Sequence, residues 1–173
     1  MQRALYEARK AYSKGEIPIG AVVVCKDRII SRAHNLTETL CDVTAHAEMQ
    51  AITSAANLLG GKYLTDCTLY VTVEPCVMCA GAIGWAQIPR IVYGCLDEKR
   101  GYHEYAPHAM HPKSTITGGI LEDECIQQAA MLFFFFLIVL NRGCVFLEKY
   151  NYTFFFVQLE YGCWISLRII TNK

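Results

Sequence analysis

The sequence predicts an α/β fold in which one β-sheet is covered by helices on both faces. Short β-branched runs alternate with segments rich in helix-forming residues, which is typical of this class. The chain has 173 residues, enough for one compact domain with a core that needs no disulfides. No internal repeat or linker interrupts residues 1 to about 130. We therefore expect a single folded domain over most of the chain.

The first part of the chain predicts a helix, a hairpin and a second helix. Apolar residues recur at helical spacing from Ala4 to Tyr12, and Gly15 follows the last turn. The runs "AVVVC" and "RIISRAHN" are separated only by Lys26 and Asp27, which predicts two antiparallel strands with a tight connection. The segment "AHAEMQAITSAANLLGG" is rich in helix formers and ends in two glycines, so it predicts the second helix.

The following segments continue the alternation. "CTLYVTV" is short and β-branched, which favours a buried strand, and a helix is expected after Pro75. "RIVYGC" predicts a further strand. The prolines, histidines and glycines of residues 99–119 predict a long surface loop, and a last helix is expected from Glu122 to about Phe136.

The end of the chain differs in kind from the rest. We expect a folded domain over residues 1–136 and an atypical apolar tail over residues 137–173, dense in aromatic residues and poor in charges. The tail is either the out-of-frame or read-through end of a gene or a genuine extension that packs on a dimer. Its apolar density favours the first explanation. The longest apolar run, residues 129–140, is shorter than the roughly 20 residues that cross a bilayer, so no membrane span is expected.

Charge and cysteine content restrict the setting. The 16 basic and 16 acidic residues cancel, so any contact with nucleic acid must use a local patch. The nine cysteines are an odd number, and the first residues predict an amphipathic helix rather than a secretion signal. Both observations favour a reducing cytoplasm.

Two cysteines stand out in "TVEPCVMCAGA". Pro75 at the first helical position would pre-set the helix, and the helix amino end favours a thiolate in the first turn. Cys76 and Cys79 are three residues apart, so on a helix both sulfurs can reach a single ion. Soft sulfur ligands favour zinc or iron.

A histidine and a glutamate lie thirty residues upstream, in "TAHAEM". His46 and Glu48 can face one site only if His46 lies at the very start of its helix. One histidine and two cysteines leave the fourth position of a tetrahedral zinc ion open, which is typical of catalysis. Zinc lowers the pKa of bound water to about 7, and Glu48 could accept that proton.

Other interpretations of these motifs exist. The cysteines could form a redox couple or be ordinary buried thiols, and a lone His-x-Glu is common by chance. The combination of spacing, proline and helix starts favours zinc. A closed structural site would need a fourth ligand from Cys41, Cys67 or Cys95, which lie in or beside predicted strands.

At these residues the chain resembles a known family. "HAE" followed by "PCVMC" resembles the zinc-dependent cytidine deaminase superfamily. The blocks "GEIPIGAVVV", "AHNLTE", "TAHAEMQAI", "LYVTVEPCVMCAGAI", "RIVYGCLDEKRG" and "GGILEDEC" are similar to the bacterial tRNA-specific adenosine deaminases. The resemblance extends from Leu5 to about Cys125.

The resemblance implies a fold, a reaction and partners. The fold would be a cytidine-deaminase-like three-layer sandwich with a central mixed sheet, assembled as a homodimer. His46, Cys76 and Cys79 would hold one zinc ion per subunit, and Glu48 would shuttle protons. The reaction would convert adenosine to inosine at the wobble position of a tRNA anticodon stem-loop.

The resemblance also suggests substrate contacts. Asn35 matches an asparagine near the base, or it only caps a strand-to-loop turn. Asp97 matches an aspartate near the sugar, or it is an ordinary loop acid. Lys99, Arg100 and Lys113 are candidates for phosphate contacts, or they form a solvated loop face.

The chain departs from the family at its end, where a basic carboxy-terminal helix is usual and is missing here. Two alternative functions follow from the shared core. One is deamination of a free base or nucleoside of the cytosine, guanine or cytidine type. The other is a non-catalytic, zinc-stabilised RNA-binding module, against which the position of Glu48 argues.

Overall fold

The computed structural model describes residues 1–140, 152–158 and 164–170, with side chains through residue 131. The chain divides into two compact units, Met1–Leu132 and Phe133–Lys173. The predicted boundary between residues 136 and 137 stays a prediction. All the candidate site residues belong to the first unit.

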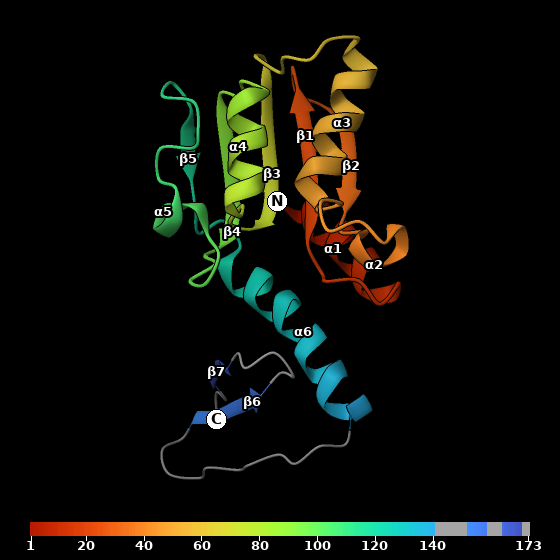
Figure 1. Cartoon of the computed structure of the whole chain (residues 1–173), viewed down its shortest axis with the longest axis vertical. Helices are drawn as coiled ribbons and strands as arrows, with labels where there is room; N and C mark the ends of the chain where they lie inside the picture. The colour runs from red at the N-terminus through yellow and green to blue at the C-terminus, as the bar shows by residue number, and fades with distance from the viewer. Residues whose placement is uncertain (141–151, 159–163, 171–173) are drawn as a thin grey trace. The chain divides into compact units, whose positions relative to one another are not determined.

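The first unit is built on one mixed sheet with the strand order β2-β1-β3-β4-β5 (Figure 1). Strand β1 pairs antiparallel with β2 and β3, whereas β3, β4 and β5 run parallel. This confirms the mixed sheet that the family resemblance implied. The strands are β1 (Gly20–Cys25), β2 (Arg28–His34), β3 (Cys67–Val73), β4 (Arg90–Cys95) and β5 (Thr115–Thr117).

The predicted hairpin between β1 and β2 is confirmed, and its turn has the expected geometry. Lys26 and Asp27 both have positive φ, 47° and 60°. Two successive residues in this conformation match the turn whose twist suits a two-residue hairpin. The strand pairing then runs from Cys25 opposite Arg28 to Gly20 opposite His34.

The helices lie on both sides of this sheet. Figure 1 shows α3 and α4 next to each other in front of it, with α1 behind. In β1, residues Gly20 to Val23 are all buried although successive side chains point to opposite faces, so both faces are covered here. The helices are α1 (Gln2–Ser13), α2 (Thr37–Leu40), α3 (Ala47–Leu59), α4 (Val77–Trp85), α5 (Tyr102–Tyr105) and α6 (Glu122–Leu140).

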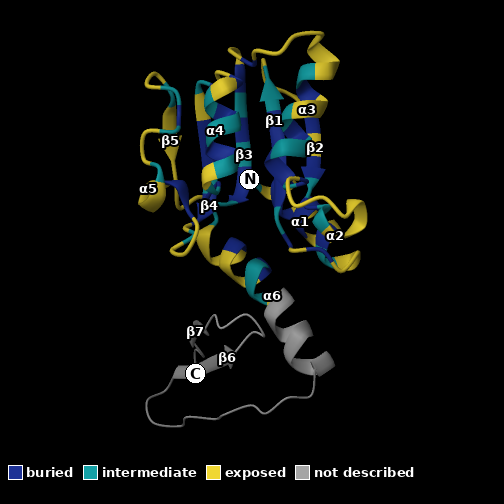
Figure 2. Cartoon of the chain, viewed as in Figure 1, coloured by how far each residue is buried: buried dark blue, intermediate teal, exposed yellow. Residues whose placement is uncertain are grey.

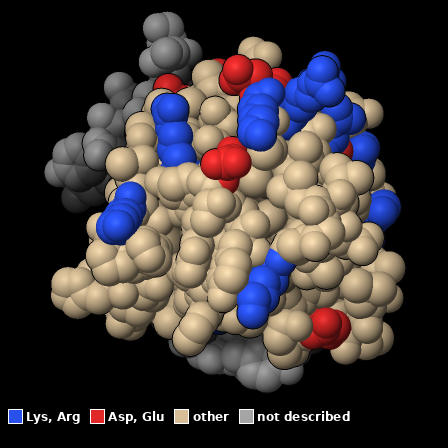
Figure 3. All heavy atoms as spheres, turned by 90° about the horizontal axis from the view of Figure 1, so that it is seen from above, with Lys and Arg blue, Asp and Glu red and all other residues tan. Residues whose placement is uncertain are grey.

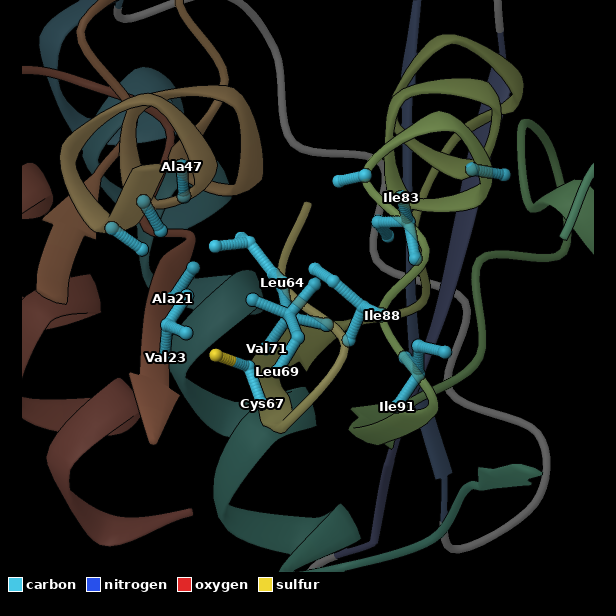
Figure 4. Close-up of a cluster of buried hydrophobic side chains, with 14 of the residues drawn as sticks. Ala21, Val23, Ala47, Leu64, Cys67, Leu69, Val71, Ile83, Ile88 and Ile91 are labelled. Atoms are coloured by element: carbon cyan, nitrogen blue, oxygen red, sulfur yellow. The ribbon is translucent and has the colours of Figure 1, made fainter. Parts of the chain in front are cut away.

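The main core lies between the sheet and helices α3 and α4. Three alanines of α3 pack there against larger aliphatic side chains of the central strands, such as Leu69 and Val71 (Figure 4). Small side chains allow the helix to approach the sheet closely. Figure 2 shows that the central strands β1 and β3 are largely buried beside α3 and α4, whereas the edge strand β5 is exposed. The core alanines of α3 are Ala47, Ala51 and Ala55.

The segment 99–119 is more ordered than the predicted surface loop. It contains the short helix α5 and the edge strand β5, and both Tyr102 and Met110 are buried. Strand β5 has only three residues, all exposed, so it is too short for a periodic pattern to reveal it. The pairing with β4 determines this strand.

The last helix, α6, is confirmed but continues to Leu140 rather than ending near Phe136. In the second unit, β6 (Tyr152–Gln158) and β7 (Trp164–Ile170) form an antiparallel pair. The other residues of the predicted tail after Leu140 lie outside the described residues. Within the described part of the chain, no helix is both long and apolar enough to span a membrane.

Candidate metal centre

Three ligand atoms converge where helices α3 and α4 begin. His46 is the N-cap residue of α3, and Cys76 is the N-cap residue of α4. The His46 Nδ1 atom lies 3.6 Å from Cys76 Sγ and 3.5 Å from Cys79 Sγ. All three ligand atoms lie within 4.8 Å of one another. The predicted position of His46 at the very start of its helix is therefore confirmed.

These distances fit a single zinc ion. Tetrahedral zinc with Zn–S near 2.3 Å and Zn–N near 2.0 Å places sulfur and nitrogen ligands roughly 3.5 Å apart. Cys79 is fully buried, whereas His46 and Cys76 are partly exposed, so one side of the cluster faces outward. The donor set and its spacing match a zinc site with one accessible position.

One detail of the prediction is corrected. Helix α4 begins at Val77, so Pro75 precedes the cap rather than occupying the first helical position. Cys76 has extended backbone angles, φ −70° and ψ 171°, as an N-cap residue does. Cys79 is in the first turn. Both sulfurs still lie at the electropositive helix start, because the cap residue and the first turn share it.

Without a bound metal, hydrogen bonds connect Cys76, Cys79 and the His46 imidazole. A hydrogen bond from the Cys79 thiol lowers the pKa of Cys76 to about 4, and contact with His46 acts in the same direction. Donating that bond raises the pKa of Cys79, and burial raises it further. The hydrogen bond with Cys76 raises the pKa of His46. A metal ion would displace these protons, because zinc binds thiolates and neutral imidazole.

Glu48 lies next to this cluster, as the second residue of α3. Glu48 is only 3 % exposed. Burial raises the pKa of the Glu48 carboxyl to about 7, although a hydrogen bond from its own backbone amide opposes the shift. A carboxyl group with this pKa can take up and release a proton near neutral pH, as a general acid–base catalyst must.

The structure does not support a closed, four-ligand site. In the described residues, no other histidine, cysteine or acidic side chain joins the three-residue cluster. Cys41 is exposed, and its thiol donates to the Glu38 carbonyl. Cys67 is hydrogen-bonded to the free thiol of Cys25, and the Cys95 thiol donates to the Thr72 carbonyl. The fourth position is therefore available to a non-protein ligand.

Asn35 lies close to the metal-binding segment and is 2 % exposed. The Leu36 amide donates to the Ala45 carbonyl at 3.0 Å, so the chain next to Asn35 contacts the residue before His46. The Asn35 side-chain amide donates to Glu16 Oε2 at 3.0 Å and to Thr37 Oγ1 at 2.8 Å. Glu16 was not singled out from the sequence, because only the fold brings it to this segment.

Asp97 shapes the loop after β4. Its Oδ1 atom accepts hydrogen bonds from the backbone amides of Lys99, at 3.1 Å, and Arg100, at 3.0 Å. The loop is fixed to the metal-binding turn, because Gly101 forms a β-bridge with Cys76. The positive charge of Arg100 reaches His46, whose pKa it lowers against the dominant effect of Cys76. Asp97, Lys99 and Arg100 thus lie on one loop beside the metal centre.

A second buried carboxylate, missed in the sequence, anchors this loop. Glu74 accepts hydrogen bonds from the backbone amides of Asp97 and His103, each at 3.1 Å. Its carboxylate also pairs with His103 Nδ1 at 2.7 Å. A side chain at Gly101 would collide with the Glu74 carboxylate, so glycine is required there.

Lys113 lies apart from the other candidate substrate residues. It comes two residues before Thr115, which pairs with Arg90 at the start of β4. The metal-binding helix α4 follows the opposite, carboxy-terminal end of the parallel strand β3. A strand of this length spans roughly 20 Å, so Lys113 is at the far end of the sheet.

The sequence pattern of the cytidine and deoxycytidylate deaminase zinc-binding region matches residues 1–95. The chain belongs to this deaminase family. The matched region contains His46, Glu48, Cys76 and Cys79, so the family's zinc-binding region coincides with the cluster found in the structure.

Two relatives of this deaminase are tRNA-specific adenosine deaminases. The enzyme of Aquifex aeolicus is 51 % identical over 98 residues, which is 57 % of this chain and 65 % of that protein, just under two thirds of its length. The enzyme of Bacillus subtilis is 44 % identical over 130 residues, which is 72 % of this chain and 81 % of that protein.

Solved structures include both RNA-acting and free-base enzymes. A structure from studies of A-to-I editing by tRNA:A34 deaminases has a TM-score of 0.70 and 43 % identity, covering 74 % of this deaminase and 96 % of that chain. Guanine deaminase of Bacillus subtilis has a TM-score of 0.53 and 42 % identity, covering 55 % of this chain and 61 % of that one.

Proposed function

We propose that this deaminase hydrolyses the amine of adenosine in the anticodon loop of a tRNA, giving inosine at the wobble position. The observation that carries the proposal is the pairing of a three-ligand zinc cluster with a buried carboxyl group whose pKa is near 7. The relatives that the chain resembles over most of their length are named for this activity.

The reaction replaces the amine of the purine ring with oxygen from water. A C–O bond forms, the C–N bond breaks, and ammonia leaves. Bound zinc, held by His46, Cys76 and Cys79, would supply Lewis acidity and lower the pKa of a water molecule. Glu48 would take one proton of that water and deliver it to the ring nitrogen. It would then move the second proton, from the new hydroxyl group on the ring carbon, to the departing amine, so that both protons of water are accounted for.

Contacts with RNA are proposed for the residues that surround the centre. Asn35 would face the target nucleotide, and Asp97, Lys99 and Arg100 would face the sugar and phosphates, as the loop geometry allows. Figure 3 shows the first unit from the end of the sheet opposite the metal centre, where basic side chains are spread among uncharged and acidic ones. We propose that the RNA-binding patch is local to the metal centre, and Lys113 is not part of it.

The proposed assembly is a homodimer with one zinc ion per subunit, in the cytoplasm. Helix α4 carries an uncovered apolar stripe formed by Val77, Gly81 and Trp85, which recur every four residues. Trp85 is 85 % exposed, and the space beside Gly81 is open. A second copy of this face would cover it. The cytoplasmic setting suits a centre whose two cysteines would be prone to form a disulfide in an oxidising compartment.

The dimer can be tested at Trp85. We expect Trp85→Glu to convert a dimer to a monomer, because a charge would be buried in an apolar interface. Light scattering after size-exclusion chromatography measures the mass directly. A wild-type protein that is monomeric at tens of micromolar would contradict the assembly.

The function is tested by incubating the zinc-loaded full chain with arginine tRNA and sequencing the product for adenosine-to-inosine change. Conversion at the wobble position is expected, and its rate should fall by about 10²- to 10⁴-fold in Glu48→Gln. A folded, zinc-loaded protein that converts none of the tRNA would overturn the proposal.

The alternative is deamination of a free purine base, which the likeness to guanine deaminase favours. The two functions share the metal centre and differ in the surrounding loops. Ammonia release from free guanine, cytosine, cytidine and adenosine separates them. Faster turnover of a free base than of the tRNA would establish the alternative.

A further inference from the structure

Glu16 is a fully buried residue that the chemistry above does not use. It follows the first helix, and it has 0 % exposed surface. Its Oε1 atom accepts the Thr39 amide at 2.7 Å, and its Oε2 atom accepts the Glu38 amide at 3.2 Å. The same Oε2 atom accepts Asn35 Nδ2 at 3.0 Å. A single carboxylate therefore holds residues 35–39, the first part of the segment between β2 and α3.

The carboxylate of Glu16 can only accept hydrogen bonds. Burial by itself favours the neutral acid, but the bonds from Thr39, Glu38 and Asn35 outweigh burial and lower the pKa of Glu16 below its ordinary value. The side chain is therefore ionised at neutral pH, and an ionised carboxylate has no proton to donate.

This restriction fixes the orientation of the neighbouring amide. If Asn35 turned its carbonyl oxygen toward Glu16, two acceptors would face each other in a buried site. The NH₂ group of Asn35 must point to Glu16, and its other N–H is taken by Thr37 Oγ1 at 2.8 Å. Both N–H groups are then committed, and Oδ1 is the atom of this amide left to meet a ligand.

We propose that Glu16 is a positioning residue that makes Asn35 a dedicated hydrogen-bond acceptor, so that the site selects a target nucleotide with a donor at this point. The inference rests on the proposed function and names a residue that sets its specificity. Within an RNA chain, adenosine has only two such donors, the 2′-hydroxyl group and the 6-amine, because the other sugar oxygens are esterified.

The test compares three variants at two positions. Glu16→Met has similar length and no acceptor, so Asn35 can rotate freely. Glu16→Gln can keep its oxygen toward Asn35 and Glu38, at the cost of one bond to the Thr39 amide. Asn35→Ala removes the acceptor itself. Zinc content and thermal unfolding confirm that each variant is folded and loaded.

We expect kcat/KM for tRNA to fall by about 10- to 100-fold in both Glu16→Met and Asn35→Ala, and by less than about 3-fold in Glu16→Gln. The double variant Glu16→Met/Asn35→Ala should be no worse than either single one by more than about 2-fold, because both changes remove the same interaction. A structural role of Glu16 would instead give additive losses that follow the loss of thermal stability.

A tRNA with 2′-deoxyadenosine at the target position identifies the donor. If the donor is the 2′-hydroxyl, the deoxy substrate is poorer for wild type and this penalty disappears in both Glu16→Met and Asn35→Ala. If the donor is the 6-amine, the deoxy substrate lowers kcat/KM by the same factor in wild type and in both variants. The losses caused by Glu16→Met and Asn35→Ala are then still non-additive in the double variant. If Glu16→Met does not fold, Glu16→Ala takes its place, with water filling the space.

The inference and the function fail in different ways. Wild-type activity on tRNA that is unchanged in Glu16→Met, or strictly additive losses in the double variant, would overturn the inference alone. Absence of wild-type activity on tRNA would overturn the proposed function and the inference with it.

Discussion

Two buried glutamates near the metal centre have opposite acid–base properties. Glu48 and Glu16 are 3 % and 0 % exposed, so both side chains are removed from water. Burial raises the pKa of Glu48 to about 7, whereas the pKa of Glu16 lies below its ordinary value. The difference lies in their partners, because Glu16 accepts two backbone amides and an amide side chain, while the main donor to Glu48 is its own backbone amide.

The comparison shows that burial alone does not decide the charge of a carboxyl group. A buried carboxylate with several hydrogen-bond donors stays ionised and can hold other groups in place. A buried carboxyl group with few donors titrates near neutral pH and can carry protons. In the proposed mechanism, one residue type thus serves for positioning at residue 16 and for proton transfer at residue 48.

The largest effect on activity is expected when one of the proposed zinc ligands is replaced. Cys76→Ser replaces a thiolate with a hydroxyl group, which is a poor zinc ligand. We expect inosine formation to fall below detection and zinc to be lost. Cys41→Ser is the matched control, because Cys41 is exposed and outside the cluster, and it should keep both properties. A zinc-free Cys76→Ser variant that forms inosine at the wild-type rate would show that the reaction does not need the metal.

The next largest effect is expected for Glu48 itself. Glu48→Gln keeps the shape but cannot transfer a proton, so kcat should fall by about 10²- to 10⁴-fold while zinc remains bound. Single-turnover measurement of inosine formation, together with elemental analysis, gives both quantities. Retention of the wild-type kcat would show that another group moves the protons.

A smaller effect is expected on stability, with opposite pH dependence for the two glutamates. The raised pKa of Glu48 contributes stability that is full below its ordinary value of 4.5 and is lost as pH rises through about 7. The lowered pKa of Glu16 contributes stability that is present above 4.5 and is lost as pH falls through the lower folded value.

In the metal-free protein, Glu48→Gln should therefore gain stability relative to wild type between pH 5 and 8. Glu16→Gln should be most destabilised relative to wild type at neutral pH, with the difference shrinking toward pH 3. Urea unfolding across this pH range measures both. If the stability of both variants relative to wild type changed with pH in the same direction, the two carboxyl groups would not have opposite pKa shifts.

The smallest effect is expected at the end of the chain. Ending the chain after Phe136 leaves the first unit, Met1–Leu132, intact. We expect kcat/KM for tRNA within about 2-fold of the full chain, because the site residues all precede Leu132. A truncated protein that is folded, zinc-loaded and inactive would assign a function to the tail.

The metal ligands could be predicted from the sequence because their residue types and spacing form a recognisable motif, although the fold has to bring His46 to Cys76 across 30 residues. His46 and Cys76 are placed by the starts of two helices, and the spacing of Cys79 follows from helical geometry. The role of Glu16 could not be predicted in this way. Its partners lie 19 to 23 residues further along the chain, and only the pairing of β1 with β2 brings them together.

The loop after β4 illustrates the same limit. Glu74 and His103 are separated by 29 residues, and their contact exists only because β3 and β4 are parallel neighbours. The placement of Lys113 at the far end of the sheet also follows from the register of β4 with β5. Residue type suggested a phosphate contact for this lysine, but strand direction determines which end of the molecule it occupies.

The most direct test of the central claim is native mass spectrometry of the purified full chain, with the metal identified by elemental analysis. The account predicts one zinc ion for each subunit in the wild type and in Glu48→Gln, and none in Cys76→Ser. A wild-type protein without a transition metal, or a Cys76→Ser variant that keeps its full complement of zinc, would contradict it.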